Sequence, residues 1–487
     1  MKRIPVSGRS EDELFAELGE IRAGDLDTKG GRTWAYVYDS GRPELFAIAE
    51  RAYLAFLHEN ALDPTVFPSL LRLENDVVAM AAAHLRAPDG VVGNFTTGGT
   101  ESIMMALKAA RDFAAETRGI SSPEMVLPVT AHAAFHKAAK YFGVKVVTTP
   151  VDTSTWKADV DAMAAAVTAN TILLVGSAVS YAHGVVDPIP EIAALAEERG
   201  VLCHVDGCIG GFILPCFRDL GQPVTDFDFV VPGVTSMSMD LHKYAYTPKG
   251  ASVVLYRDAA VRRHQLFACA GWTGYTVINT TFQSTKSGGA LAAAWTVMNY
   301  LGVDGYREIA ERTLAATRAI IAGVGGLDDL SVMGDPEANL VAIDSDTVNV
   351  FEVVDEMRDL SWYVQPQLGF KGSRENIHLS VGGASLPLVP QLMEDFARAV
   401  KSARPKGPAV ADAGLVEFLN SIDPDTLDDA TFDELLAAGG LGAGVDGAAP
   451  EVPSHTAGIS AILNVCPAPL AERVLIEYFN RLYVPTP

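Results

Sequence analysis

One lysine of this chain has the surroundings of a covalent cofactor anchor. Lys243 follows His242 after a run of small and polar residues, and it lies downstream of a strand-like segment that ends at Asp206. Pyridoxal phosphate needs a lysine amine for its aldehyde and a carboxylate for its pyridine nitrogen, so Lys243 and Asp206 are candidates for these roles. The sequence between them leaves room for one more strand and its connections. On residue type alone, however, a His-Lys pair is usually a solvated surface pair.

A second segment has the composition of a phosphate-binding turn. Residues 91–102 run from an apolar stretch into glycines and hydroxyls that include Gly99 and Thr100, and helical periodicity follows. Such a turn presents free backbone N–H groups and the positive end of a helix dipole, which suit a phosphate. The spacing is neither that of a Walker loop nor that of a dinucleotide fingerprint, so it does not indicate nucleotide binding.

Four segments occur in a characteristic order. They are residues 96–103, 132–139, 204–212 and 240–250. Together they resemble the sphingosine-1-phosphate lyases, a branch of the pyridoxal phosphate-dependent group II decarboxylase family. The resemblance extends from about residue 31 to about residue 306, and more weakly to residue 483. It implies an α/β protein of fold type I, with a mostly parallel sheet in the large domain and a smaller α+β C-terminal domain.

The resemblance implies a role for each candidate cofactor residue. Lys243 would hold pyridoxal phosphate as a Schiff base, and Asp206 would keep the pyridine nitrogen protonated, which makes the ring a better electron sink. His132 would stack on the ring and fix its tilt relative to the bond that breaks. The phosphate ligands that the resemblance implies are Gly99, Thr100 and His242.

The substrate half departs from the family pattern. Tyr38 matches a tyrosine of the family's N-terminal motif. Lys249 would either handle a phosphate or a proton at the site or be solvated in a turn. Asp63 stands where the family has a histidine near the substrate phosphate, and an anion there repels a phosphate. Residues 284–286 stand where the family has Gly-Ser-Arg, and Lys286, at the arginine position, lacks the planar fork of arginine. Val277 stands where the family has a tyrosine. We expect an intact cofactor half and a rewritten substrate half.

The implied activity is that of a carbon–carbon lyase, with retro-aldol cleavage of an amine substrate. Decarboxylation of an amino acid, as in the group II relatives, is the first alternative, and the two reactions differ in which bond lies perpendicular to the ring. A non-catalytic homologue that keeps the fold is the second alternative. Lys243, Asp206 and His132 together favour catalysis, because a non-catalytic chain has no need of all three. The resemblance also implies a homodimer with shared active sites.

The partner that the resemblance implies is a small-molecule amine or amino acid, and composition excludes other classes. The net charge of −23 argues against nucleic acid and anionic membrane surfaces. No apolar run reaches the roughly 18 residues of a membrane span, so we expect a cytoplasmic enzyme without a membrane anchor. The five cysteines show no paired spacing. Cys203, Cys208 and Cys216 cluster around His204, where core thiols are expected rather than metal ligands.

Apolar strands and amphipathic helices alternate from about residue 91 to 258, which predicts a parallel sheet with crossover helices. The expected strands are residues 171–175, 201–205 and 251–256, and the expected helix between the first two is 189–196. The loop that holds Lys243 precedes the last strand, so the lysine should lie at the sheet edge where ligands bind.

We expect three regions: an N-terminal arm with helices (1–60), a cofactor domain (61–306) and a small domain (307–487). In the last we predict a helix over 309–324 and strands over 340–343 and 377–381. The stretch 402–453, rich in Ala, Gly, Pro and Asp, is expected to form surface loops with turns at 439–440 and 442–444. Its acidic run around 423–429 should cap helices or stay solvated.

Overall fold

A computed structural model describes residues 3–408, 413–438 and 455–485. Its large sheet has seven strands in the order β1-β7-β6-β5-β4-β2-β3. The strands are β1 (Val92–Thr96), β2 (Glu124–Pro128), β3 (Lys145–Thr149), β4 (Thr171–Ser177), β5 (Leu202–Asp206), β6 (Ser236–Asp240) and β7 (Ser252–Tyr256). Only β7 is antiparallel to its neighbours. The mostly parallel sheet and its predicted strands are therefore confirmed.

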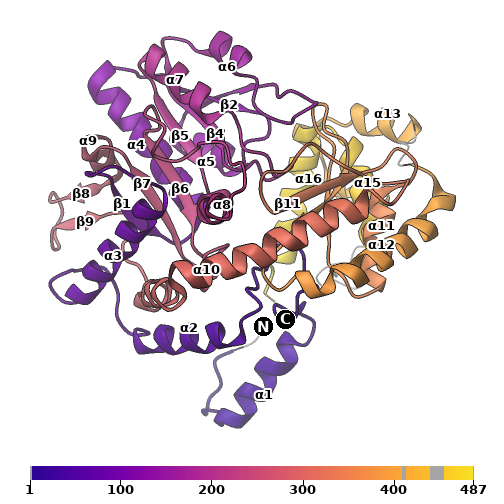
Figure 1. The fold of residues 1–487 in the computed structure, drawn as a ribbon, viewed down its shortest axis with the longest axis horizontal. Coiled ribbons are helices and arrows are strands. Elements are labelled where there is room, and N and C mark those ends of the chain that lie inside the picture. Colours follow the sequence, from indigo (N-terminus) through magenta and orange to yellow (C-terminus); the bar gives the residue numbers. More distant parts are fainter. Residues whose placement is uncertain (1–2, 409–412, 439–454, 486–487) are drawn as a thin grey trace.

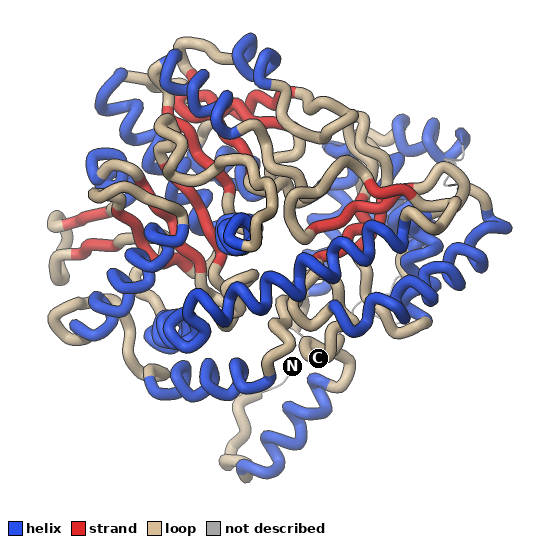
Figure 2. Tube along the Cα trace, viewed as in Figure 1, coloured by secondary structure: helices blue, strands red, loops and turns tan. Residues whose placement is uncertain are grey.

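Helices cover both faces of this sheet (Figures 1 and 2). One face packs on α4 (Gly99–Arg118) and α5 (Ala134–Phe142). The other packs on α3 (Pro68–His84), α7 (Ile189–Arg199), α8 (Gly210–Asp219) and the first half of α10 (Gly288–Val324). Strands β2, β4, β6 and β7 are buried along their whole length, as expected for strands covered on both sides. Three further helices complete the domain: α2 (Pro43–Ala55), α6 (Val160–Ala166) and α9 (Ala259–Arg262).

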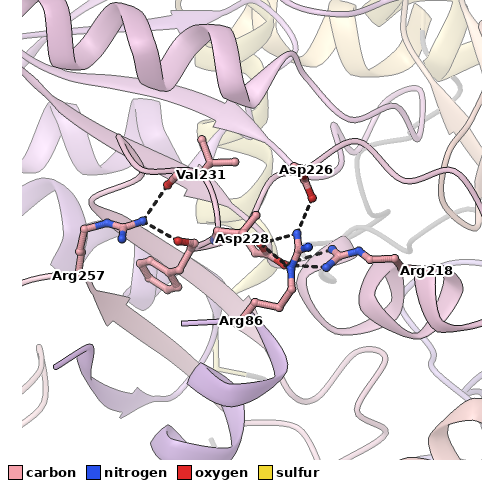
Figure 3. A network of polar contacts seen from close by, with 8 residues as sticks. Arg86, Arg218, Asp226, Asp228, Val231 and Arg257 are labelled. Carbon is pink, nitrogen blue, oxygen red and sulfur yellow. Dashed lines mark hydrogen bonds and ion pairs between the residues drawn. The ribbon is translucent and has the colours of Figure 1, made fainter. Parts of the chain in front are cut away.

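A network of charged side chains surrounds the buried Asp228 in the large domain (Figure 3). The Asp228 side chain is fully buried and accepts hydrogen bonds from Arg86, which follows α3, and from Arg218 in α8. Arg86 also pairs with Asp226 at 2.5 Å. Arg257, just after β7, donates to the carbonyl groups of residues 229, 231 and 234. These contacts fix the loop that leads from α8 into β6, the strand that precedes Lys243.

Helix α10 joins the two domains and crosses Figure 1 diagonally. It begins at Gly288, well before the predicted start at residue 309, and kinks at Gly302, whose φ of 56° suits a residue without a side chain. Ile309 and Ala310 still pack in the core of the large domain, whereas Ala316 and Ile320 pack in the core of the small one. The expected boundary at 306/307 thus falls inside a continuous helix.

The small domain is built on an antiparallel sheet in the order β10-β11-β13-β12. Its strands are β10 (Ser331–Val332), β11 (Leu340–Asp344), β12 (Gln365–Gln367) and β13 (Asn376–Ser380), and α11 (Val350–Asp359) and α12 (Val389–Ala403) pack against it. The N-terminal arm joins this core, because Trp34 is buried there and exchanges backbone hydrogen bonds with Tyr363 and Ser380. The predicted α+β character and both predicted strands are confirmed.

The prediction of surface loops over 402–453 is wrong for the part that the structure describes. That part contains α13 (Ala413–Ser421) and α14 (Asp429–Ala438), which form a small core with α15 (Ala457–Val465) and α16 (Ala468–Leu482). Alanine favours helix, and the leucines at helical spacing supply the core. The predicted capping role is confirmed for Asp423 and Asp428, which accept from the backbone of Asp425 and Thr431. The predicted turns at 439–440 and 442–444 lie outside the described residues.

Two elements stand apart from the body. Helix α1 (Glu11–Arg22) projects at the bottom of Figure 1 and buries none of its residues, although a capping box at Ser10 and Glu13 stabilises its start. The hairpin of β8 (Phe267–Cys269) and β9 (Val277–Asn279) lies at the left edge of Figure 1. Within the described ranges, no helix combines the length and the hydropathy needed to cross a bilayer.

Candidate active site

A cavity of about 420 Å³ opens where the parallel strands of the large sheet end. Asp206 is the last residue of β5 and Asp240 the last of β6, while His132 follows β2. The first turn of α4, entered from β1, forms another wall. The carboxyl ends of parallel strands are the usual place for ligands in such sheets. The structure therefore brings all six predicted cofactor residues to one cavity: Gly99, Thr100, His132, Asp206, His242 and Lys243.

Lys243 projects into this cavity from the turn after β6 and pairs with Asp240. Its Nζ lies 2.9 Å from Asp240 Oδ2, and the Asp240 side chain is only 2% exposed. Burial alone would lower the pKa of the Lys243 amine, but the Asp240 carboxylate, with Cys208 and Tyr38, raises it above its ordinary value. In the reverse direction, burial would raise the pKa of Asp240, but the charge of Lys243, with smaller contributions, lowers it. The amine is thus held as an ammonium group at a fixed place.

Asp206 lines the same cavity as Lys243 and is almost fully buried. Its Oδ1 accepts hydrogen bonds from the Cys208 backbone at 3.0 Å and from the Ser238 hydroxyl at 3.2 Å. A carboxylate fixed in this way is the partner that a protonated ring nitrogen needs.

The anion-binding wall combines the start of α4 with His242. The first turn of a helix has N–H groups without intrahelical partners. Gly99 allows close approach there, since a Cβ at this position would lie 2.7 Å from Cys208 Sγ and 2.8 Å from both Asp240 oxygens. His242 Nδ1 accepts from the Ala251 backbone at 3.3 Å, so the neutral ring carries its proton on Nε2. Together these groups form a set of donors for a phosphate.

His132 and Tyr181 form the wall toward the small domain. The Ala134 N–H donates to His132 Nδ1 at 3.1 Å, so Nε2 of the neutral ring is the free donor. The two rings make an edge contact with centroids 6.4 Å apart, and Tyr181 stacks on His378 at 4.3 Å. The Tyr181 hydroxyl donates to Gln365 at 2.6 Å. Both rings also line a neighbouring cavity of about 230 Å³.

The residues present fit pyridoxal phosphate. An amine for the aldehyde, a buried carboxylate for the ring nitrogen, an imidazole for the ring face and a helix start with His242 for the phosphate line one cavity. One further observation agrees: Asp240 Oδ1 is buried without a hydrogen-bond partner among the described residues.

Two of the predicted substrate residues lie together near this cavity. Lys249 Nζ is 4.5 Å from the centroid of the Tyr38 ring and donates to the Tyr36 carbonyl at 3.1 Å. Although Lys249 is partly open to solvent, desolvation of its amine, followed by repulsion from Lys243, lowers its pKa to about 8. Burial raises the pKa of Tyr38, and the Lys243 charge opposes that rise, which shows how near the two are.

The other two predicted substrate residues do not line the cavity. Lys286 is buried, and its Nζ lies 2.6 Å from both carboxylate oxygens of Glu74, with further bonds to the Phe95 carbonyl and the Thr280 hydroxyl. Its charge is thus engaged in an internal ion pair. Asp63 is exposed and accepts from the backbone and the hydroxyl of Thr65 at 2.8 and 2.7 Å.

Sequence reasoning missed two residues of the site. Asp240 was visible three positions before Lys243, a spacing that places both on one side of a tight turn, but its role depends on distances. Tyr181 had no local signal, because it reaches the cavity from the loop between β4 and α7. As for metals, no cluster of three or more His, Cys, Asp or Glu in the described part of the chain could hold an ion. The five cysteines are free thiols, and Cys203, Cys208 and Cys216 are buried.

Comparison with known proteins decides the family. A model described as "Pyridoxal-dependent decarboxylase conserved domain" matches residues 45–344. The sphingosine-1-phosphate lyase of Oryza sativa subsp. japonica is 40% identical over 367 residues, which are 74% of this chain and 68% of that protein. That of Dictyostelium discoideum is 36% identical over 422 residues, 86% of this chain and 78% of that protein. This chain belongs to the sphingosine-1-phosphate lyase family.

A solved structure of the Burkholderia pseudomallei sphingosine-1-phosphate lyase agrees with this membership. It superimposes with a TM-score of 0.79 at 36% identity and covers 86% of this chain and 96% of that chain. As a member of the family, the chain is a pyridoxal phosphate-dependent lyase of fold type I. The predicted family, fold class, cofactor and enzyme class are confirmed.

The C-terminal helices match a separate model, described as "Pyridoxal-dependent enzyme, C-terminal putative HTH domain", over residues 413–481. This region contains eleven Asp or Glu residues but only two Arg and no Lys. Binding to nucleic acid depends on neutralising phosphates with basic side chains. The acidic composition therefore argues against nucleic-acid binding by these helices.

Proposed function

We propose that this lyase cleaves the bond between Cα and Cβ of an amine that carries a hydroxyl on Cβ, by retro-aldol chemistry. The observation that supports this reaction over decarboxylation is Lys249, an amine with a pKa lowered to about 8 near the cavity. Retro-aldol cleavage needs a base for the β-hydroxyl proton, whereas decarboxylation does not. Lys249, held by the Tyr38 ring and the Tyr36 carbonyl, is a suitable base in its neutral form.

The roles of the other residues follow from their contacts. Bound pyridoxal phosphate would supply an electron sink for the electrons left on Cα when the Cα–Cβ bond breaks. Asp206 would hold the ring nitrogen, and His132 would cover the ring face and exclude water from it. Lys249 Nζ accepts the hydroxyl proton. Lys243 Nζ, beside Asp240, holds a proton that it delivers to the substrate carbon after cleavage. The aldehyde and the amine then leave.

Two contacts shape our proposal for the substrate. The Lys286 charge is paired with Glu74, and Asp63 is an exposed anion. Neither Lys286 nor Asp63 therefore provides a cation for a substrate phosphate. We therefore propose that phosphorylated long-chain bases bind weakly, and that amines without a phosphate are better substrates. The same departures keep amino acid decarboxylation as the second candidate, together with the decarboxylase family model.

A substrate screen with product detection tests these proposals. Purified enzyme is offered phosphorylated and unphosphorylated long-chain bases, shorter β-hydroxy amines and amino acids. We expect aldehyde release from β-hydroxy amines. Carbon dioxide release from amino acids without any aldehyde would overturn the retro-aldol proposal. No turnover by the cofactor-loaded protein would favour the non-catalytic alternative.

We also propose a homodimer with shared active sites, in the cytoplasm. Helix α1 exposes an apolar stripe of Leu14, Phe15, Leu18 and Ile21, and aromatic side chains around the β8–β9 hairpin, such as Trp272, are exposed as well. A contiguous apolar surface of this kind favours a protein partner. Light scattering of the full chain tests the dimer, and a monomeric active enzyme would overturn it.

The proposed compartment, the cytoplasm, is supported by the thiols. The five free thiols favour a reducing compartment.

A further inference from the structure

Asp206 is the end of a buried chain of hydrogen bonds between β5 and β6. The parallel register pairs His204 with Ser236 and Asp206 with Ser238, so alternate side chains of both strands meet on one face. Ser236 Oγ lies 2.9 Å from His204 Nδ1, His204 Nε2 lies 3.3 Å from Ser238 Oγ, and Ser238 Oγ lies 3.2 Å from Asp206 Oδ1. His204 and Ser238 are 0% exposed.

The direction of each bond follows from counting protons. An ionised Asp206 can only accept, so the single hydroxyl proton of Ser238 points to it. The Ser238 oxygen must then accept from His204 Nε2 and from the Cys208 thiol, which is 3.3 Å away. Burial lowers the pKa of His204 to about 4, so its neutral ring has one proton, which this bond places on Nε2. His204 Nδ1 accepts from Ser236.

All three bonds therefore donate in one direction, toward Asp206. In such a chain each bond polarises the next, and the donation stabilises negative charge on the last acceptor. The bonds from Ser238 and from the Cys208 backbone both end on Oδ1, which also fixes the rotation of the carboxylate. A carboxylate whose charge accepts these donors and whose rotation is fixed would leave the shared proton on the ring nitrogen of the cofactor.

We propose that His204 and Ser238 are positioning residues that keep Asp206 ionised and aimed at the pyridine nitrogen, and so keep that nitrogen protonated. The proposal rests on the cofactor alone and not on the substrate or on the bond that is cleaved. Failure of the retro-aldol proposal would leave it intact.

The test measures the ring nitrogen directly. The protein is loaded with pyridoxal phosphate labelled with ¹⁵N in the ring, and its NMR shift distinguishes a protonated from an unprotonated pyridine. We expect Ser238→Ala and His204→Phe to move the shift toward the unprotonated value and to lower kcat about tenfold. We expect His204→Gln, whose amide can donate to Ser238, to restore most of both. Ser236→Ala removes only the outermost bond and should have the smallest effect.

A purely structural role predicts a different pattern. If the network only joins β5 to β6, Ser238→Ala will lower Tm but leave the ¹⁵N shift at the wild-type value, and that result would overturn the proposal. Thr317→Val is a matched control, because it removes a buried hydroxyl from α10 whose bond to the Thr313 carbonyl is remote from the cofactor. It should lower Tm without changing the shift. Equal shifts in His204→Phe and His204→Gln would also contradict the relay.

Discussion

The two halves of this active site are built in different ways. The cofactor half is taken from the ends of neighbouring strands and the turn into one helix, so residues far apart in sequence meet in a cavity within a single chain. The predicted substrate half is drawn from the N-terminal arm and three separate loops, and only Tyr38 and Lys249 meet near that cavity. A parallel sheet dictates the first arrangement, whereas the second depends on packing between segments that are distant in the sequence.

The largest expected effect breaks the cofactor half at its anchor. Lys243→Ala should abolish turnover and the visible absorbance of the loaded enzyme, since no other amine pairs with Asp240 at 2.9 Å in the described part of the chain. Borohydride reduction of the wild-type protein followed by peptide mapping should place the label on Lys243. A label on Lys249 or Lys137 would show that the anchor is assigned to the wrong residue.

Replacement of Asp206 should have the next largest effect on rate. Asp206→Ala should keep part of the cofactor but lose on the order of a hundredfold in kcat, comparable to the removal of one preorganised electrostatic contact. His132→Ala should lose less, because it weakens only stacking and orientation. Steady-state kinetics with cofactor content measured in parallel checks both. Wild-type turnover by Asp206→Ala would mean that β5 does not present the ring-nitrogen partner.

Lys286 distinguishes a substrate ligand from a structural residue. Lys286→Met leaves Glu74 buried without its partner, and breaking a buried ion pair costs about 3–5 kcal/mol of unfolding free energy. We expect a large drop in the midpoint of chemical denaturation and an unchanged KM. The double variant Glu74→Leu/Lys286→Met should recover most of the stability. A raised KM at unchanged stability would instead restore the phosphate-binding role that the sequence suggested.

Some of these site residues could be predicted from the sequence and others could not. Asp206 was predictable because it follows an apolar strand pattern, and Lys243 because it stands beside His242 in one of four motifs that occur in the family order. Lys286 was not, because a loop lysine reads as exposed and nothing local reveals Glu74, a distant residue in α3. The C-terminal helices were missed for a similar reason, since their Ala- and Gly-rich composition outweighed the sparse leucines that make their core.

The pH dependence sharpens the role of Lys249. Its pKa is lowered to about 8, so the neutral base appears as pH rises through 8, and kcat/KM should increase over the same interval. Lys249→Arg stays protonated in that range and should lose this rising limb together with about 10²-fold in rate. A rising limb that survives in Lys249→Arg would assign the base to another group.

The smallest expected effect concerns Asp63, the clearest departure from the family pattern. At about 4 Å, two like charges cost on the order of 4 kcal/mol at an effective dielectric of 20 but only about 1 kcal/mol in water, and Asp63 is exposed. Removing its charge should therefore lower KM for a phosphorylated long-chain base by about fivefold at most, and less at high salt.

Asp63→Asn is the matched control for Asp63→His, because its amide oxygen can still accept from Thr65 and keep the turn. If charge alone matters, Asn and His should improve binding alike. If the family histidine acts as a ligand, only His should do so, and by more than fivefold. Efficient native cleavage of sphingosine-1-phosphate that neither change alters would show that the phosphate is bound elsewhere and that the substrate half is not rewritten at this position.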